Sequence, residues 1–255
     1  MITKMSTMKN MVNVFIPCCM DMFVLSAAKA TISILEKLGD ECYYNEEQTC
    51  CGRQFFLRGD RDTASQLAFN HTTFFDNESD IVVPSAACAG FIRNYYGKLI
   101  DTQAFPKSVK HITRRTFELC DYIVNEKQVK ELGNSFPEKV FYFQSCAVRN
   151  LYRSGDEVET LLRNTKGLEL FTDPTMNLCC SANGDFAMHN QEMSEFLLKK
   201  IVDRIMETGA EFVTCADLHC LQYIDAYIQS EDIDLEVIPL PVILNASESV
   251  NEEEK

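Results

Sequence analysis

Cysteine is the residue type whose number and spacing most clearly suggest chemistry in this sequence. The 255 residues include 12 cysteines, and two adjacent pairs, Cys50-Cys51 and Cys179-Cys180, lie 129 residues apart. One further cysteine precedes each pair and one follows it, at displacements of 128 and 132 residues between the halves. The repeat predicts a duplicated unit of about half the chain with one site in each copy. The two sets are Cys18, Cys50, Cys51 and Cys88, and then Cys146, Cys179, Cys180 and Cys220.

Four cysteine sulfurs that meet at one point are suitable ligands for zinc, or for iron combined with inorganic sulfide. Structural zinc sites usually take their ligands from C-x-x-C pairs, and no C-x-x-C occurs in this chain. Two adjacent thiolates fit poorly around one small ion, whereas a cluster of several irons offers each sulfur a different metal. The pattern therefore favours iron-sulfur clusters, with zinc sites and a vicinal disulfide as the alternatives.

The composition indicates a globular protein whose cysteines stay reduced. Hydrophobic residues make up 46% of the chain and aromatic residues 10%, and no stretch reaches the roughly 18 to 20 apolar residues that a membrane span needs. The first residues lack the apolar segment of a secretory signal, so we expect a cytoplasmic location. Cysteines in that compartment bind metals or carry out redox chemistry rather than form a disulfide framework.

The charge balance excludes one class of partner. The net charge is −14, with 38 acidic against 24 basic residues. Binding to nucleic acid rests on clustered lysine and arginine, so no nucleic-acid partner is expected. Part of the acidic excess lies in a tail, residues 247–254, which lacks an apolar pattern and is predicted to be disordered.

The elements that must position the cysteines are short apolar strands that alternate with amphipathic helices. In the first half, Cys18 follows the first strand and Cys88 follows the third. The predicted strands are 11–16, 41–44 and 81–84, and the predicted helices are 27–38, 61–75 with Asp60 as N-cap, and one that begins near residue 89.

The second half repeats this order. Its predicted strands are 139–143, 168–171, 211–214 and a closing strand at 235–238. Its predicted helices are one from about residue 157 with Asp156 as N-cap, a long one over 185–206, and one that runs from Cys220 to residue 228. The core-facing residues expected in the long helix are Met193, Phe196, Leu197, Ile201 and Ile205.

This alternation predicts an α/β fold of two similar lobes, each a largely parallel sheet with flanking helices, related by internal duplication. The expected domains are 11–104 and 139–244, joined by a helical connection over 105–138, with 1–10 and 245–255 disordered. Within the connection we expect a bridging helix at 112–124 with Cys120 toward the core. Loops at the carboxyl edge of a parallel sheet converge, so each set of cysteines can reach one point.

The doubled cysteine pattern resembles the cysteine-rich CCG domain family of iron-sulfur oxidoreductases. The family includes the cysteine-rich subunit of heterodisulfide reductase, the iron-sulfur subunit of glycolate oxidase and a lactate-utilisation group. A chain that consists of two such domains is most similar to the last group. The resemblance covers about residues 11–240 and is carried by Cys18-Cys-Met-Asp21, Gln48-Thr-Cys-Cys-Gly52, Val83-Pro-Ser-Ala-Ala-Cys-Ala-Gly90, Lys166-Gly-Leu-Glu-Leu170 and Ala216-Asp-Leu-His-Cys220.

The resemblance implies a function and a ligand set. It implies one or two iron-sulfur clusters of the 4Fe-4S type, held by the eight repeated cysteines. It also implies electron transfer during oxidation of L-lactate, or a similar 2-hydroxy acid, to the 2-oxo acid, together with other subunits of a redox complex. The alternatives are a redox subunit for disulfides and thiols, like heterodisulfide reductase, and a zinc-stabilised module without catalysis.

The chain departs from the family pattern at several positions. The family motif ends in C-x-x-C, but its first cysteine is replaced here by Ser85 in one half and Asp217 in the other. Each half therefore has four motif cysteines rather than five, and we expect Ser85 and Asp217 to be at most weak oxygen ligands or hydrogen-bond partners of the ligands. The second copy also has fewer glycines after its pair, in Cys180-Ser-Ala-Asn-Gly184, which leaves less room for backbone N–H groups at the sulfurs.

The remaining candidates are assigned smaller roles. Cys19 could replace Cys18, but Cys18 matches the motif position and is preferred. Cys42 and Cys215 are expected to pack in the core, and His219 could tune a cluster through a hydrogen bond. The chain has no P-loop, G-x-G-x-x-G or G-x-S-x-G motif, which favours electron transfer over nucleotide chemistry.

Overall fold

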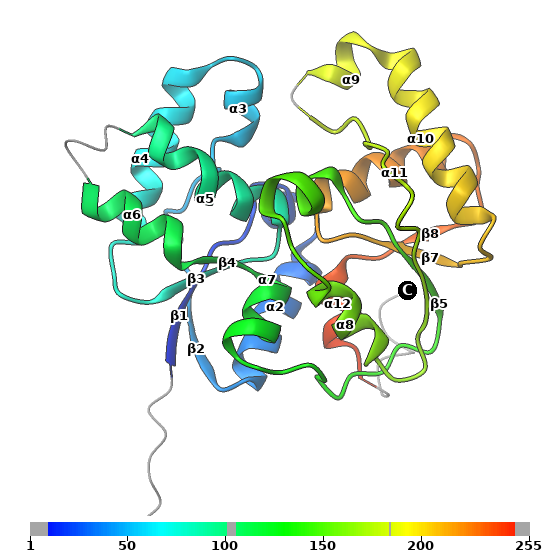
Figure 1. The fold of residues 1–255 in the computed structure, drawn as a ribbon, viewed down its shortest axis with the longest axis horizontal. Coiled ribbons are helices and arrows are strands. Elements are labelled where there is room, and N and C mark those ends of the chain that lie inside the picture. Colours follow the sequence, from blue (N-terminus) through cyan, green and yellow to red (C-terminus); the bar gives the residue numbers. More distant parts are fainter. Residues whose placement is uncertain (1–9, 101–105, 184, 248–255) are drawn as a thin grey trace, which may run out of the picture.

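The computed structural model describes residues 10–100, 106–183 and 185–247. This part of the chain forms two four-stranded sheets, with strand orders β2-β1-β3-β4 and β6-β5-β7-β8 (Figure 1). All strand pairs are parallel. The strands are β1 (Asn10–Val14), β2 (Asp40–Tyr43), β3 (Asp80–Val83), β4 (Thr116–Glu118), β5 (Lys139–Tyr142), β6 (Glu169–Phe171), β7 (Phe212–Thr214) and β8 (Glu236–Val237).

Helices precede, follow and cover these strands. In the first half they are α1 (Cys18–Phe23), α2 (Leu25–Lys37), α3 (Arg53–Leu57), α4 (Arg61–Phe74), α5 (Ala86–Leu99), α6 (Pro106–Arg115), α7 (Leu119–Asp121) and the π-helical turn η1 (Tyr122–Glu126). In the second half they are the π-helical turn η2 (Ala147–Tyr152), α8 (Glu157–Arg163), α9 (Phe186–His189), α10 (Gln191–Met206), α11 (Leu218–Ser230) and α12 (Leu240–Asn245). No helix of the described residues is long and apolar enough to span a membrane.

The two halves have the same topology, which confirms the α/β fold of two similar lobes. In each lobe the first strand is central, the second lies on one side of it, and the third and fourth lie on the other. The central strands are rich in valine, and Val12, Val14, Val140 and Val213 are fully buried. Burial on both faces is typical of parallel sheets covered by helices.

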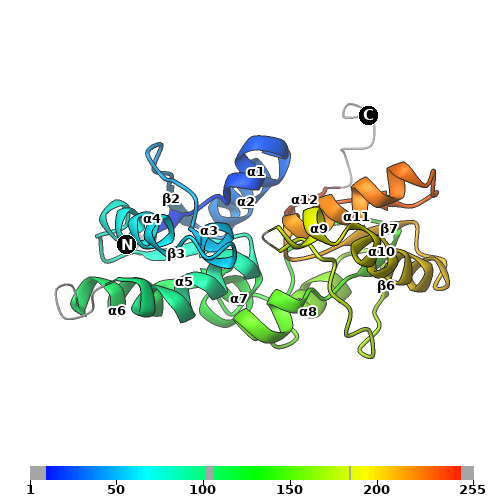
Figure 2. The same ribbon diagram turned by 90° about the horizontal axis from the view of Figure 1, so that it is seen from above.

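The lobes lie side by side (Figure 2), and one helix near the end of each lobe packs on the other lobe. Helix α12, at the end of the second lobe, packs on α2 of the first, and α7, at the end of the first lobe, packs on α8 of the second. Between them α5 packs on η2, where a side chain at Gly90 would place its Cβ 2.8 Å from the backbone N of Tyr152. Glycine at this position therefore allows the lobes to approach closely.

The prediction of one bridging helix over 112–124 is wrong. The segment is divided among α6, β4, α7 and η1, and β4 pairs with β3 as the edge strand of the first sheet. Apolar residues at this spacing suit a helix, but tertiary pairing with an open sheet edge decides the conformation. Glu118 then ends the strand, because its carboxylate accepts the N–H groups of Cys120 and Asp121 at the start of α7.

The predicted long helix at 185–206 is interrupted at Asn190, which separates α9 from α10. The inward face of α10 is also offset from the expected one. Met193 and Phe196 are exposed, whereas Leu198, Ile201 and Ile205 are buried. The burial of Ile201 and Ile205 confirms part of the predicted face, but the apolar residues of this helix cover more than one face, so the pattern misplaced its amino-terminal part. Helix α12, which follows Pro239, was not predicted.

The predicted termini and N-caps have mixed outcomes. Asn10 begins β1 and Asn245 ends α12, so these two residues, expected to be disordered, are in regular elements. The disorder predicted for 1–9 and 248–255 lies outside the described residues. Asp60 caps α4 by accepting the N–H of Thr63 at 3.1 Å, whereas Asp156 makes no side-chain cap bond to α8.

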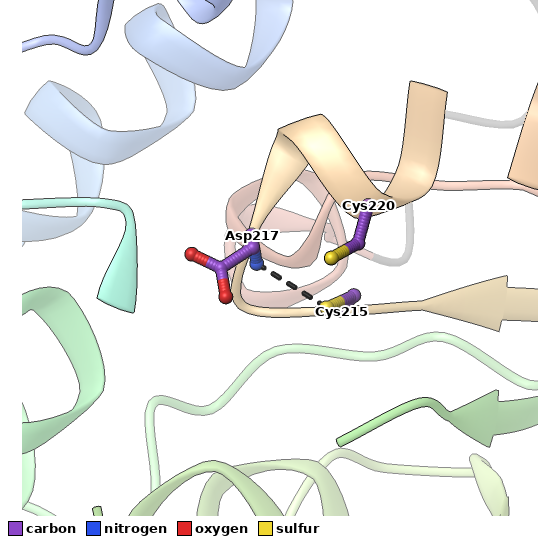
Figure 3. A group of neighbouring side chains, drawn as sticks. All are labelled: Cys215, Asp217 and Cys220. Atoms are coloured by element: carbon purple, nitrogen blue, oxygen red, sulfur yellow. Dashed lines mark hydrogen bonds between the residues drawn. The ribbon is translucent and has the colours of Figure 1, made fainter. Parts of the chain in front are cut away.

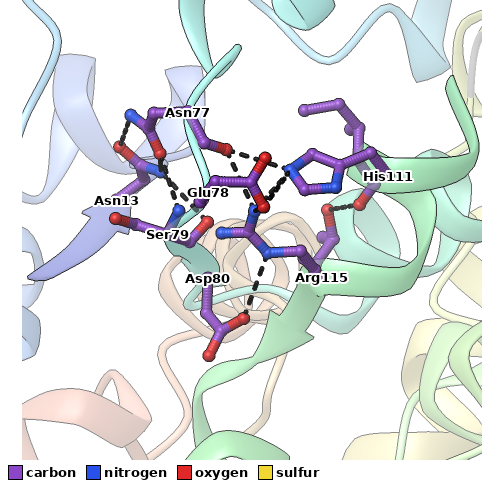
Figure 4. A network of polar contacts seen from close by, with 9 residues as sticks. Asn13, Asn77, Glu78, Ser79, Asp80, His111 and Arg115 are labelled. Carbon is purple, nitrogen blue, oxygen red and sulfur yellow. Dashed lines mark hydrogen bonds and ion pairs between the residues drawn. The ribbon is translucent and has the colours of Figure 1, made fainter. Parts of the chain in front are cut away.

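A polar network fixes α6 against the amino-terminal end of β3 (Figure 4). Asn13 and Asn77 exchange two amide hydrogen bonds of 2.7 and 3.0 Å. Arg115 donates to the carbonyl of Asn77 at 3.0 Å and to Asp80 at 3.4 Å, and His111 contacts the same carbonyl at 3.0 Å. The network lies at the strand ends opposite to the cysteines and has a structural role.

Candidate metal centre

The first-lobe cysteines lie in three segments at the carboxyl ends of its strands. Cys18 begins α1 after β1, Cys50 and Cys51 lie in the loop between β2 and α3, and Cys88 is in the first turn of α5 after β3. The loop turns at Gly52, whose φ is +86° and whose Cβ position lies 3.2 Å from the carbonyl oxygen of Ala64. Glycine suits both constraints.

The four sulfurs of the first lobe form a continuous series of contacts. The side chains of Cys18 and Cys50 interact with each other, as do those of Cys50 and Cys51, and Cys51 Sγ lies 3.3 Å from Cys88 Sγ. The backbone N–H of Gly52 donates to Cys50 Sγ at 3.4 Å. The structure thus brings together all four cysteines that the sequence singled out in this half.

The second lobe repeats the arrangement. Cys146 Sγ lies 3.8 Å from Cys179 Sγ, and Cys180 Sγ lies 2.7 Å from Cys220 Sγ. The N–H of Ser181 donates to Cys179 Sγ at 3.4 Å, as Gly52 does in the first lobe. Ser181 adopts a φ of +66°, and its buried hydroxyl has no hydrogen-bond partner in the described part of the chain.

Contacts between the sulfurs change their acidity. Hydrogen bonds with Cys18 and Cys51 lower the pKa of Cys50 to about 3, and those with Cys179 and Cys220 lower the pKa of Cys180 to about 5. The neighbouring thiols that share these contacts have raised pKa values, with burial as a further cause. One thiol in each sulfur group therefore loses its proton readily, and a bound cation would favour deprotonation of the other thiols.

Cys215 is a fifth sulfur of the second lobe that the sequence analysis assigned to packing. Among the described residues, Cys215, Asp217 and Cys220 form a group whose potential ligand atoms all lie within 4.8 Å of one another (Figure 3). Cys215 is 2% exposed, and its thiol, after that of Cys180, raises the pKa of Cys220. Its position two residues before Asp217 lies outside the repeated motif, so the spacing argument could not identify it.

Asp217 of the second lobe and Ser85 of the first are hydrogen-bonded to each other and connect the two lobes. The carboxylate of Asp217 accepts a hydrogen bond from Ser85 Oγ at 3.1 Å and from the backbone N–H of Ala87 at 2.6 Å, both in the first lobe. It also accepts from the hydroxyl of Ser145. In Figure 3 the carboxylate points away from the sulfurs of Cys215 and Cys220. These contacts give Asp217 and Ser85 hydrogen-bonding roles at the N-terminus of α5.

The two sulfur groups also face each other through cross-lobe contacts. Arg53, which begins α3, donates to Asn183 Oδ1 at 2.6 Å, and Asn183 Nδ2 donates to Cys179 Sγ at 3.6 Å. Contact with Cys179 and burial raise the pKa of Cys146, and the charge of Arg53 opposes this rise. Helices α3 and α9 accordingly lie at one end of the molecule (top in Figure 1).

His219 of the second lobe affects the sulfur group of the first lobe. It adjoins Cys220 in sequence and adds to the effect of the neighbouring thiols in lowering the pKa of Cys50. Burial, followed by the charge of Arg53, lowers the pKa of His219 itself. The sequence contained both residues, but their cross-lobe positions depend on how the lobes pack.

The other cysteines lie outside these groups. Cys120 is fully buried, which confirms its predicted packing toward the core. Cys42 is half-buried on β2, where its thiol lies 3.9 Å from the carbonyl of Ile32. Cys19 is buried at 8% exposure, next to the exposed Cys18, and it is Cys18 that contacts Cys50.

The donor set fits a soft metal centre. Each lobe offers four sulfurs in mutual contact, and backbone N–H groups donate to sulfur in both. Thiolates select zinc, copper(I) or iron-sulfur clusters over hard cations. The geometry thus supports binding of a metal or an iron-sulfur cluster, and the individual ligand assignments remain predictions.

Comparisons with known proteins agree with this chemistry. The model of the CCG cysteine-rich domain matches residues 12–93 and 140–225, one match per lobe. Lactate utilization protein A of Bacillus licheniformis is 31% identical over 92% of this chain and 99% of its own. The protein of the same name from Bacillus cereus strain B4264 is 30% identical over 92% of this chain and 98% of its own.

One solved structure has a similar fold. A hypothetical protein from Helicobacter pylori superposes with a TM-score of 0.63 at 13% identity, over 92% of this chain. The chain spans 48% of the length of that protein, and at this identity the similarity concerns the fold alone. From the two matches of the domain model and the similarity to the Bacillus proteins along nearly their whole length, the chain belongs to the CCG cysteine-rich domain family, in the group of the Lactate utilization protein A relatives.

Proposed function

We propose that this protein is an iron-sulfur electron-transfer subunit of a multi-protein system that oxidises L-lactate, or a similar 2-hydroxy acid, to the 2-oxo acid. The observation that carries the proposal is the pair of sulfur groups, each built from four cysteines at the carboxyl ends of a parallel sheet. The names of the Bacillus relatives supply the link to lactate utilisation. A cytoplasmic location is part of the same proposal.

The cysteines would hold one cluster in each lobe. In the first lobe the ligands are Cys18, Cys50, Cys51 and Cys88, and in the second Cys146, Cys179, Cys180 and Cys220. When bound, an iron-sulfur cluster supplies transfer of single electrons at a potential set by its charge, its hydrogen bonds and its exposure. The protein residues supply the thiolates, the N–H donors to Cys50 and Cys179, and shielding of the deeper sulfurs from water.

Other residues would support transfer between the two centres. Asp217 fixes the lobes to each other through Ser85, Ala87 and Ser145, so the sulfur groups keep a constant separation. Arg53 places a permanent positive charge beside the second sulfur group. In a protein with a redox cofactor, the fold positions the cofactor and nearby charges tune its electronics.

Metal analysis of anaerobically purified protein tests the proposal. We expect iron and acid-labile sulfide in equal amounts, about eight of each per chain for two 4Fe-4S clusters, with a brown colour that bleaches on reduction. About four of each would assign a cluster to one lobe. Stoichiometric zinc without sulfide that persists after anaerobic reconstitution would overturn the redox function and leave a zinc-stabilised module.

A complementation experiment tests the physiological part. The gene is expressed in a Bacillus licheniformis strain that lacks its Lactate utilization protein A, and growth is measured on L-lactate as the carbon source. We expect growth to be restored by the natural chain and not by a Cys50→Ala/Cys51→Ala variant. Restored growth with both chains would show that the sulfur group of the first lobe is not needed for lactate oxidation.

A further inference from the structure

The second lobe contains a sulfur for which the first lobe has no equivalent. Cys215 follows β7 and stands five residues before Cys220, and the corresponding residue before Cys88 is Val83 at the end of β3. Both residues are buried, at 2% and 0% exposure. The same place in the duplicated fold is therefore filled by a hydrocarbon side chain in one lobe and by a thiol in the other.

The Cys215 thiol lies next to the sulfur group of the second lobe. Its sulfur lies within 4.8 Å of that of Cys220, and Cys220 Sγ lies 2.7 Å from Cys180 Sγ. Figure 3 shows the sulfurs of Cys215 and Cys220 directed toward each other from β7 and α11. A metal centre that uses Cys220 therefore has Cys215 within reach without a change in the backbone.

Cys215 accepts a backbone N–H hydrogen bond at its sulfur, as two of the predicted ligands do. The N–H of Asp217 donates to Cys215 Sγ at 3.3 Å. Gly52 donates to Cys50 and Ser181 to Cys179 across the same two-residue spacing, at 3.4 Å in each case. Hydrogen bonds of this kind stabilise a thiolate and tune a cluster that it holds.

The surroundings of this sulfur are mostly apolar in the described part of the chain. The small cavity beside Cys215 is lined mostly by apolar residues, including Met20, Pro84, Leu218 and Leu240, with Glu118 as the charged member. The carboxylate of Asp217 is occupied by Ser85, Ala87 and Ser145. The carboxylate of Glu118 is occupied by the N–H groups of Cys120 and Asp121.

We propose that Cys215 is a fifth thiolate ligand of the metal centre in the second lobe, whereas the centre in the first lobe has four. The inference rests on the proposed iron-sulfur function. Ligation replaces the S–H bond of Cys215 by a bond from sulfur to iron and releases one proton to solvent. The additional thiolate makes this centre more negative by one charge, which distinguishes its electronic structure and its reduction potential from those of the first.

Substitution of Cys215 in the reconstituted full-length chain tests the proposal. Cys215→Ser keeps the shape of the side chain and replaces its sulfur by the smaller oxygen, and Cys120→Ser is the matched control, since Cys120 is similarly buried but belongs to neither group. We expect Cys215→Ser to change the electron paramagnetic resonance and Mössbauer spectra of one of two clusters, with up to half of the iron lost. The other cluster and the Cys120→Ser variant should keep the spectra of the natural protein.

A reciprocal variant, Val83→Cys, gives an independent measurement. It places a thiol at the equivalent position of the first lobe, and the spectrum of the first cluster should move toward that of the second. Natural spectra and full iron content in folded Cys215→Ser protein, with the unfolding temperature of the metal-free chain unchanged, would refute Cys215 as a ligand and leave the iron-sulfur function intact. Absence of iron from the natural chain itself would refute both.

Discussion

The two lobes have one topology but differ at the residues nearest to their sulfur groups. Gly52 of the first lobe corresponds to Ser181 of the second, Ser85 to Asp217, and Val83 to Cys215. Strand order, parallel pairing and the places of the cysteines are nevertheless the same. The duplicated scaffold therefore fixes where the sulfurs meet, while the residues around them give each site its own hydrogen bonds and charge.

Removal of one cysteine pair at a time should have the largest effect on this pair of sites. Cys50→Ala/Cys51→Ala is expected to abolish the first cluster, and Cys179→Ala/Cys180→Ala the second, because each change deletes two of the four proposed ligands. Iron and sulfide analysis should show a loss of about half in either variant. Spectra of the two variants then assign each signal to a lobe. Full iron content in either double variant would contradict the assignment of that lobe.

The junction residue Asp217 should dominate the stability of the lobe interface. Asp217→Ala leaves the buried donors of Ser85, Ala87 and Ser145 without their acceptor. Each such loss costs about 1–3 kcal/mol, so we expect the free energy of unfolding of the metal-free chain to fall by about 3 kcal/mol or more. That corresponds to a decrease of roughly 6 to 12 °C in Tm.

The matched control for this change is Asp203→Ala. Asp203 forms an ion pair with Lys199 on the exposed face of α10, at 3.2 Å. Pairs of this kind contribute about 0–1 kcal/mol. Equal losses of stability from the two variants in urea unfolding would show that Asp217 does not hold the lobes together.

Glu118 and its counterpart Pro239, the residues directly before α7 and α12, also distinguish the lobes. Burial raises the pKa of Glu118 to about 8 from an ordinary value of 4.5. A raised pKa means that the folded state binds the proton more tightly than the unfolded state does. The contribution to stability is therefore complete below about pH 4.5 and is lost as pH rises to about 8.

Urea unfolding of the natural chain and Glu118→Gln between pH 5 and pH 9 measures this contribution. Glutamine has no proton to lose, so Glu118→Gln should be close to the natural chain at pH 5 and more stable at pH 9, by up to a few kcal/mol. The difference between the two chains isolates Glu118 from the thiols, which titrate in both. A difference in the free energy of unfolding between the two chains that stays constant from pH 5 to pH 9 would contradict a raised pKa of Glu118.

The turn after each cysteine pair offers a smaller test of the comparison. Gly52 and Ser181 both have positive φ, +86° and +66°, a conformation that costs a residue with a side chain about 1–2 kcal/mol. Gly52→Ala should destabilise the metal-free chain by at least this amount, because its Cβ also meets the carbonyl of Ala64 at 3.2 Å. Ser181→Gly should gain about 0.5–1 kcal/mol, since the greater freedom of unfolded glycine offsets part of the relief. Urea unfolding that shows a loss from Ser181→Gly would indicate a role for its hydroxyl.

Much of this architecture could be predicted because it depends on local patterns. Short apolar runs located the described strands except β4, and the repeated spacing identified two sets of four cysteines whose sulfurs lie close together in each lobe. The bridging helix at 112–124 was mispredicted because β4 forms by pairing with β3, a contact distant in sequence. Cys215, Arg53 and the Asp217 junction could not be identified as site features, since their roles arise from packing of one segment against another.

The last contrast between the lobes concerns charge. Arg53 of the first lobe donates a hydrogen bond to Asn183, which in turn donates to Cys179 of the second sulfur group. Among the contacts of the described residues, no arginine of the second lobe reaches the first sulfur group in this way. A fixed cation stabilises the reduced, more negative form of a nearby cluster. Arg53→Gln should therefore lower the reduction potential of the second cluster and leave the first less affected, as measured by a redox titration followed by electron paramagnetic resonance.

Arg58→Gln is the matched control for Arg53→Gln. Arg58 follows α3 and also crosses to the second lobe, where it pairs with Asp185 at 2.7 Å, but it is 46% exposed and its charge is neutralised by that partner. Water screens an exposed pair of this kind, so Arg58→Gln should leave both potentials in place, and Arg53→Lys should retain most of the natural value. Equal shifts in Arg53→Gln and Arg58→Gln would mean that loosened contact between α3 and α9, rather than the charge of Arg53, sets the potential of the second centre.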